Sequence, residues 1–76
     1  MKISIEYCSM WNYLPRASSL EAEIKNDFDQ AEVSLISSGG GVYEIRLDDD
    51  LIFSKKSLNR FPDDGEIRQL IMDRQQ

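Results

Sequence analysis

The sequence predicts an α/β (α+β) protein: a four-stranded mixed sheet with two helices, in the order strand, helix, strand, strand, strand, helix. Several short segments alternate apolar and polar residues, which is typical of half-buried strands. Two other segments repeat apolar residues every three or four positions, as on the buried side of a helix. Glycine and aspartate clusters separate the later strands. Seventy-six residues suffice for one small domain, which spans residues 1–76.

The first half of the chain predicts a strand followed by a long helix. Polarity alternates over residues 3–7, and this strand ends at Cys8. Pro15 belongs to the first turn of the helix, where its missing N–H is not needed, and Asn12 is the expected N-cap. The helix should therefore begin just after Cys8. Its apolar positions are Leu14, Ala17, Leu20, Ile24 and Phe28.

The second half predicts three strands. Val33–Ile36 is a short run of mostly branched apolar residues, and Gly39–Gly41 breaks it. Val42–Leu47 and Leu51–Phe53 form a hairpin around the turn Asp48–Asp50. A polar loop follows.

The last helix is expected to begin at Asp63, because Glu66 stands three residues later in a capping-box pattern. A strand–helix–strand unit requires a parallel pair with a right-handed crossover, and the hairpin extends the sheet in the antiparallel sense. This arrangement is the minimal thioredoxin-like one.

Composition excludes several classes of function. Nine Lys and Arg against fourteen Asp and Glu give a net charge of −5, without a basic stripe, so we expect no nucleic-acid partner. The absence of histidine excludes a Ser–His or Cys–His pair, and one cysteine forms neither an internal disulfide nor a thiolate metal site. We expect no metal and no resident cofactor. No apolar stretch approaches the roughly 20 residues that span a bilayer, so we expect no membrane partner and a cytoplasmic, reducing location.

Cys8 is the candidate reactive residue. It ends the first strand before a helix, whose positive end favours a thiolate, so we expect an uncovered sulfur there. Gly39, Gly40 and Gly41 should pass nearby and let backbone amides approach a bound thiol compound. The alternative is that Cys8 is a small buried hydrophobic residue.

Two further groups of residues leave alternatives open. Trp11, Tyr13 and Met10 form a bulky patch around the cysteine, either as core or as an exposed docking surface. Lys55 and Lys56 follow the fourth strand, where a lysine pair either attracts an acidic partner or prevents edge-strand aggregation.

The chain resembles the selenoprotein W-related (Rdx, SelT/SelW/SelH-type) family over nearly its whole length. The matching stretches are Tyr7-Cys8, Asn12–Leu14 with Arg16-Ala17, Gly40–Asp48, Leu51–Lys56 and Phe61-Pro62. The resemblance implies a thioredoxin-like fold and a role in thiol chemistry and cell redox homeostasis, with glutathione or a protein thiol or disulfide as partner. It also implies that Cys8 is the first cysteine of a Cys-x-x-Cys or Cys-x-x-selenocysteine motif.

Trp11 stands where the family has its second cysteine or selenocysteine. A dithiol cycle within one chain is therefore impossible, and the resemblance leaves a mixed disulfide on Cys8 with glutathione or a partner protein. The alternative is an interaction module without catalysis that binds through Trp11, Tyr13 and Gly39–Gly41. The sequence leaves the oligomeric state open.

Overall fold

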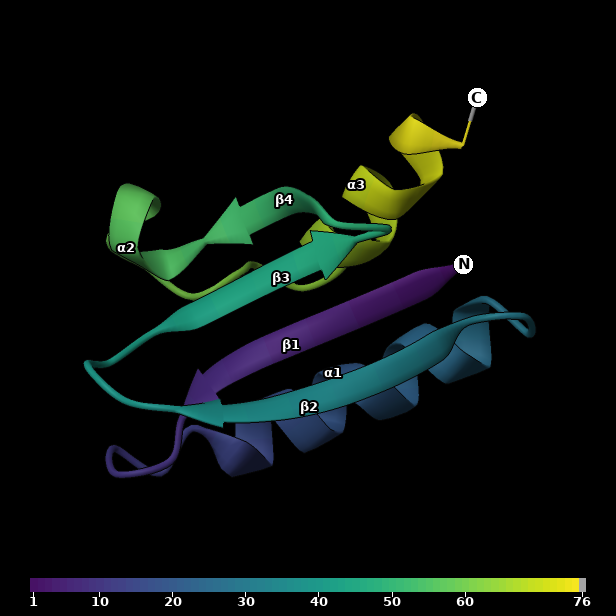
Figure 1. The fold of residues 1–76 in the computed structure, drawn as a ribbon. Coiled ribbons are helices and arrows are strands. Elements are labelled where there is room, and N and C mark those ends of the chain that lie inside the picture. Colours follow the sequence, from purple (N-terminus) through teal and green to yellow (C-terminus); the bar gives the residue numbers. More distant parts are fainter. Residues whose placement is uncertain (76) are drawn as a thin grey trace.

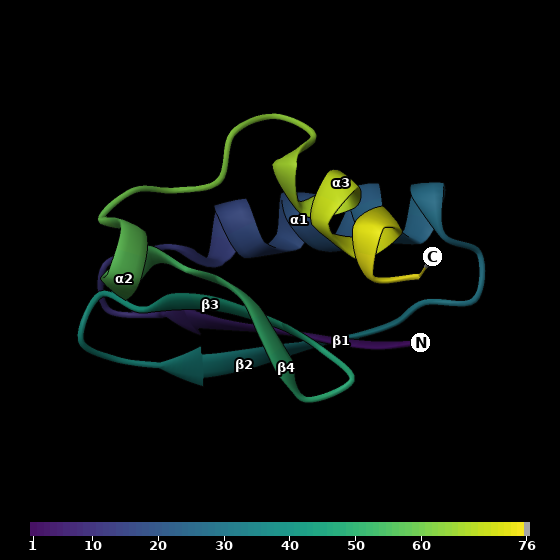
Figure 2. The same cartoon turned by 90° about the horizontal axis from the view of Figure 1, so that it is seen from above.

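The computed structural model describes residues 1–75 as a four-stranded sheet with two of its three helices packed on one face (Figures 1 and 2). The elements are β1 (Lys2–Cys8), α1 (Leu14–Asp27), β2 (Glu32–Ser38), β3 (Tyr43–Leu47), β4 (Asp50–Ser54), α2 (Lys55–Leu58) and α3 (Glu66–Arg74). Seen along the sheet, α1 and α3 lie side by side above it, and α2 lies at the end of β4 (Figure 2).

The strand order is β2-β1-β3-β4, which confirms the predicted mixed sheet. β1 pairs in parallel with β2 and antiparallel with β3, so the first strand of the chain is central. The parallel pair exists because α1 carries the chain back across the sheet. β3 and β4 form the predicted hairpin, and Asp48 and Asp49 make its turn with positive φ angles of 47° and 76°.

Strand alternation directs one set of branched side chains toward the helices. In β1 and β3 the paired residues Ile5 and Ile45 are both completely buried, while Glu6 of β1 and Arg46 of β3 form an ion pair of 3.7 Å. The helices bury only a narrow stripe each, so the core remains a single layer between the sheet and α1 with α3. It comprises Ile3, Ile5, Ala17, Ile24, Tyr43, Ile45, Leu47, Phe53, Ile67 and Ile71.

The structure adds one short helix to the two predicted ones, because residues Lys55–Leu58 form α2 where a polar loop was expected. Ser54 caps this single turn: its Oγ accepts a hydrogen bond of 3.2 Å from the Ser57 N–H. Asn59 ends the turn in the left-handed conformation, at φ 58°. The turn therefore depends on its two caps, and a four-residue segment carries no periodicity that could reveal it.

Both long helices begin later than predicted. Asn12 is not the N-cap of α1: it has a positive φ of 60°, and its N–H donates to the Ser9 carbonyl in a turn. Tyr13 occupies the cap position without a side-chain hydrogen bond. α3 begins at Glu66, after Gly65 at φ 77°, although the Glu66 carboxylate does accept the Asp63 N–H at 2.9 Å as a capping box requires.

Among residues 1–75, the helices are too short and too polar for any of them to span a lipid bilayer.

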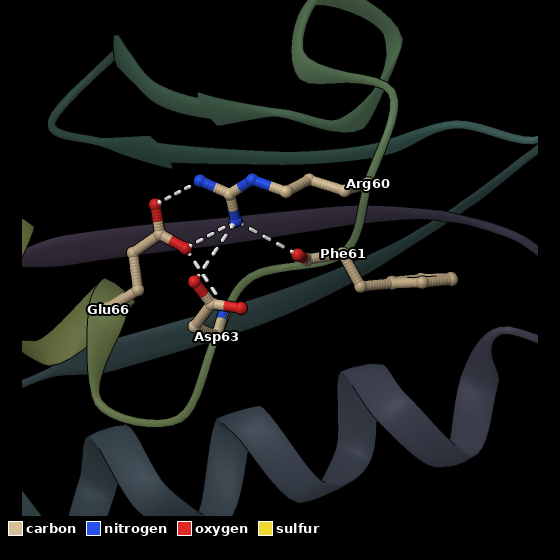
Figure 3. A network of polar contacts seen from close by, with 4 residues as sticks. All are labelled: Arg60, Phe61, Asp63 and Glu66. Atoms are coloured by element: carbon tan, nitrogen blue, oxygen red, sulfur yellow. Dashed lines mark hydrogen bonds and ion pairs between the residues drawn. The ribbon is translucent and has the colours of Figure 1, made fainter.

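An Arg60-centred ion-pair network fixes the loop before α3 (Figure 3). Two guanidinium nitrogens of Arg60 donate to the two carboxylate oxygens of Glu66 at 2.7 and 2.9 Å, and Nη1 also donates to the Phe61 carbonyl at 3.1 Å. The Phe61 ring points away from this network, toward α1 (Figure 3). The hydrogen bonds from Arg60, then the one from the Asp63 N–H, lower the pKa of Glu66 from 4.5 to about 2.

This lowered pKa predicts a specific loss of stability in acid. The folded state favours ionised Glu66, so its contribution is complete above about pH 5 and is lost as the pH falls through 4.5 toward 2. Urea midpoints of the native protein and of Glu66→Gln should therefore differ at pH 7 and converge near pH 2. Glu32→Gln, on an exposed edge-strand position, should show no such convergence. A constant difference for Glu66→Gln at every pH would contradict the assignment.

Candidate functional site

The structure brings the predicted site residues to one end of the sheet. The Cys8 N–H donates to the Val42 carbonyl at 2.9 Å, and the Ser9 N–H donates to the Ser38 carbonyl at 3.0 Å. The segment Gly39–Gly41 connects Ser38 to Val42, so the two residues that flank it are both hydrogen-bonded to the end of β1. The expected proximity of the glycine segment to Cys8 is confirmed.

Cys8 is completely buried, so the prediction of an uncovered sulfur was wrong. The reason is that β1 continues through Cys8, which pairs with Ser38 of β2 and is bonded to Val42 before β3. Its backbone is therefore hydrogen-bonded within the sheet and is not part of a loop. Cys8 nevertheless lies outside the connected core cluster between the sheet and the helices.

The start of α1 lies farther from Cys8 than the sequence analysis expected. The helix begins six residues later, at Leu14, and the Tyr13 N–H donates to the Cys8 carbonyl oxygen at 3.1 Å. The prediction that the helix begins just after Cys8 was therefore wrong, and residues 9–12 form a turn instead. The effect of a helix dipole is confined to about one turn, so the dipole of α1 stabilises a thiolate at Cys8 much less than expected.

Trp11 lies against Gly41 and is still 61% exposed. A Cβ at Gly41 would overlap Cζ3 of the indole and lie 2.8 Å from Cε3, so only glycine permits this contact. Gly41 also has a φ of 71°, which a side chain would strain. Trp11 is thus part of the surface that covers the end of the sheet and not part of the core.

Trp11 and three further aromatic rings form a group of edge-to-face contacts. Tyr13 is its hub: its ring centroid lies 6.2 Å from Trp11, 6.4 Å from Tyr43 and 4.8 Å from Phe61. Tyr43 and Phe61 are 5.2 Å apart. Such pairs contribute about 0.5–1.5 kcal/mol each beyond the area they bury. We call these four residues the aromatic row.

Two cations lie over the aromatic row. The Arg16 guanidinium is 4.0 Å from the Phe61 ring centroid, and Lys55 Nζ is 5.6 Å from Tyr13 and 5.4 Å from Phe61. Arg16 and Phe61 were not among the predicted site residues. The spacing of Tyr13 and Arg16 carried a signal, because residues three apart at a helix start share one face.

A groove of about 150 Å³ lies beside the aromatic row, between α1 and the loop before α3. Arg16, Tyr43 and Phe61 contribute to its lining, but Cys8 does not. Burial raises the pKa of Tyr43 to about 12, with a smaller opposing effect of the Arg16 charge, so its phenol stays protonated near neutral pH. Within the described part of the chain, His, Cys, Asp and Glu side chains form no cluster of three suited to a metal ion.

Comparison with known proteins gives consistent results. The model of the Rdx family matches residues 2–73. The solved structure of a selenoprotein W-related protein from Vibrio cholerae is 30% identical in sequence with a TM-score of 0.89, over 95% of this chain and 92% of that one. A Bordetella parapertussis structure is 25% identical with a TM-score of 0.89, over 96% and 95%. No match was found among curated proteins. These matches confirm the predicted thioredoxin-like fold.

The Trp11–Gly41 contact predicts that alanine destabilises the protein at Gly41 and is tolerated at Gly39. Gly41→Ala should destabilise the protein by about 1–3 kcal/mol, because it combines a strained φ with overlap of the indole. The tryptophan fluorescence of Gly41→Ala should also change, because Trp11 is the only tryptophan of the sequence. Gly39→Ala should cost less than about 0.5 kcal/mol, because its Cβ would meet nothing within 4 Å. Urea unfolding followed by fluorescence measures both. Equal effects of the two substitutions would contradict the contact.

Proposed function

Because the chain belongs to the Rdx family, we propose that it carries out thiol–disulfide exchange through Cys8 alone, as a thioredoxin-like redox protein. The observation that carries this proposal is the place of Cys8: it ends β1, at the position of the first motif cysteine, with Trp11 at the second. Of the two motif positions, only Cys8 therefore carries a thiol that can react.

The step begins with the Cys8 thiol giving its proton to solvent. The thiolate attacks one sulfur of a disulfide such as oxidised glutathione, the disulfide bond breaks, and the other half leaves as a thiolate. Cys8 is oxidised to a mixed disulfide while the leaving half is reduced. A second external thiol then attacks the mixed disulfide and releases Cys8. This cycle suits a cytoplasmic, reducing location, where an external thiol is supplied continuously.

Burial of Cys8 makes this chemistry depend on local opening. Cys8 is buried at the end of β1, where the turn of residues 9–12 begins and where both residues flanking Gly39–Gly41 are hydrogen-bonded, and Trp11 of this turn packs across Gly41. Loop segments of this kind open at a lower free energy than the core, because they bury few apolar contacts. The reactive form of the protein is therefore one in which Trp11 leaves Gly41.

A second candidate function is an interaction module that binds a partner protein without catalysis. It is favoured by the exposure of two large side chains in the turn after β1: Met10 is 88% exposed and Trp11 61%. Exposed tryptophan is enriched at protein interfaces. In this reading Trp11, Tyr13 and Gly39–Gly41 form the contact surface, and Cys8 only fills space beneath it.

The redox proposal predicts a single glutathione adduct on the folded protein. Native protein incubated with oxidised glutathione at neutral pH should gain the mass of one glutathionyl group, and Cys8→Ser should gain none. Dithiothreitol should remove the group. An adduct that forms only after unfolding in urea would contradict the exchange mechanism and favour the interaction module.

The proposed opening predicts that Trp11 slows the reaction of Cys8. Trp11→Ala should raise the rate of iodoacetamide alkylation by about fivefold or more, because loss of about 1 kcal/mol of local packing favours the open form to that extent. Leu51→Ala is the matched control: it removes a similarly exposed apolar side chain from β4 and should leave the rate unchanged. An unchanged rate in Trp11→Ala would show that Trp11 does not cover the thiol.

A further inference from the structure

The two edge strands of the sheet differ in how they end the hydrogen-bonded ladder. β4 is irregular, because its pairing with β3 shifts between Ile45 and Arg46, and it runs directly into α2 with Lys55 and Lys56. Bulges and lysines are common protections of an edge strand against other chains. β2 has seven residues, pairs with β1 in an unbroken register, and contains no lysine, arginine or proline. One edge of the sheet is therefore left open.

The hydrogen bonds of β2 show which of its backbone groups face outward. The Glu32 N–H donates to the Met1 carbonyl, and the Ser38 carbonyl accepts from the Ser9 N–H, so both residues of β2 turn these groups toward the β1 side. Backbone groups alternate in direction along a strand, so those of every second residue point away from β1. These residues are Val33, Leu35 and Ser37. Within residues 1–75, no other segment pairs with this side of β2.

The outward N–H and C=O groups of three alternate residues match the main chain of an extended peptide. An added strand satisfies them with the same ladder that joins the strands of a sheet. The edge is flanked by apolar side chains on both faces. Leu35 pairs with the core residue Ile5 and is half-buried on the helix face, whereas Ile36 is 46% exposed on the opposite face. A segment rich in β-branched residues would cover both.

A second copy of this chain does not fit the same edge. Two β2 strands related by a two-fold axis would pair antiparallel, with the helices of both copies on the same face of the joined sheet. α1 runs behind β2 along the length of the strand, one layer away from it (Figures 1 and 2). Neighbouring strands are about 4.8 Å apart, whereas packed helices need about 8–10 Å between their axes, so the two α1 helices would collide. The fitting partner is a strand without a helix at this position.

Charge at the two ends of the edge distinguishes the ends of the partner strand. Asp29 and Glu32 are exposed around the start of β2, and no cation among residues 1–75 lies within 4.0 Å of either carboxylate. Ser37 and Ser38 at the other end are uncharged. Antiparallel pairing is slightly more stable than parallel pairing, and it places the C-terminal end of an added strand beside Glu32. A basic residue at that end would pair with the acidic end of the edge.

We propose that the open edge of β2 is a docking site for a partner protein, which adds an extended segment as an antiparallel strand. The segment is rich in β-branched residues and ends in lysine or arginine. Its N–H and C=O groups bond Val33, Leu35 and Ser37, and its basic end lies beside Glu32. Docking requires no bond change, and it depends neither on Cys8 nor on the exchange proposed above.

The test uses a synthetic peptide of seven residues that alternates threonine and valine, ends in lysine and carries a fluorescent label at its N-terminus. With its lysine beside Glu32, the peptide turns the N–H groups of its second, fourth and sixth residues toward β2. N-methylation of these three residues should weaken binding, measured by fluorescence anisotropy, by about tenfold or more. N-methylation of the third, fifth and seventh residues is the matched control and should have little effect, because those N–H groups face away from β2.

Substitutions in the protein test the edge itself. Ser37→Pro removes one outward N–H at an edge position where proline is tolerated, and it should weaken binding by about threefold or more, whereas Ser37→Ala should bind normally. Glu32→Gln should weaken binding of the lysine peptide by about twofold. Asp64→Asn changes the net charge equally in the loop before α3 and should have no effect. Cys8→Ser should bind like the native protein.

Amide hydrogen exchange gives a readout without any substitution. The N–H groups of Val33 and Leu35 should exchange at least about tenfold faster than those of Ser34 and Ile36, and saturating peptide should slow them. Equal effects of the two N-methylation patterns, unchanged exchange at Val33 and Leu35, or no binding would overturn the proposal. So would a native dimer in sedimentation that Ser37→Pro dissociates, because a second copy would then occupy the edge. The glutathione adduct on Cys8 tests the exchange mechanism separately, so either proposal can fail while the other stands.

Discussion

β1 is hydrogen-bonded to β2 on one side and to β3 on the other, and this double pairing determines where every other part lies. It places Ile3 and Ile5 in the middle of the core, under both long helices. It also extends to Cys8, so the only thiol of the chain belongs to the sheet rather than to a loop. The connection to α1 must then leave the sheet in a tight turn, and that turn carries Trp11 to the surface over Gly41.

The site is held together by aromatic contacts instead of a polar network. Tyr13 at the start of α1, Tyr43 at the start of β3 and Phe61 before α3 contact one another, so three distant segments meet at one point. The Arg60 network fixes the loop backbone on the side of Phe61 that faces away from the ring. The turn of residues 9–12 is joined to these contacts through Trp11, which packs on Tyr13 and also lies against Gly41.

Most of the fold followed from the sequence because its signals are local and repeated. Alternation in β1 and β3 and the three-to-four spacing of α1 each extend over several residues, and crossover geometry then gave the parallel pairing of the first two strands. The errors occurred where one hydrogen bond decides the structure. Ser54 caps α2, and the left-handed Asn12 delays α1. The burial of Cys8 depends on how far pairing with Ser38 continues, and neither strand shows that in its own composition.

The central place of β1 has a consequence for how the molecule assembles during synthesis. β1 leaves the ribosome first, yet its antiparallel neighbour β3 ends only at Leu47 and the α3 residues that cover it, Ile67 and Ile71, come later still. A nascent chain can form α1 and the β1–β2 pair early, but one edge of β1 then stays unpaired until translation has passed β3. Closing that edge needs contacts between residues far apart in the chain, which are slow to form. Until then, the incomplete sheet offers an open strand edge to other chains, and this is the stage at which the protein is most prone to aggregate.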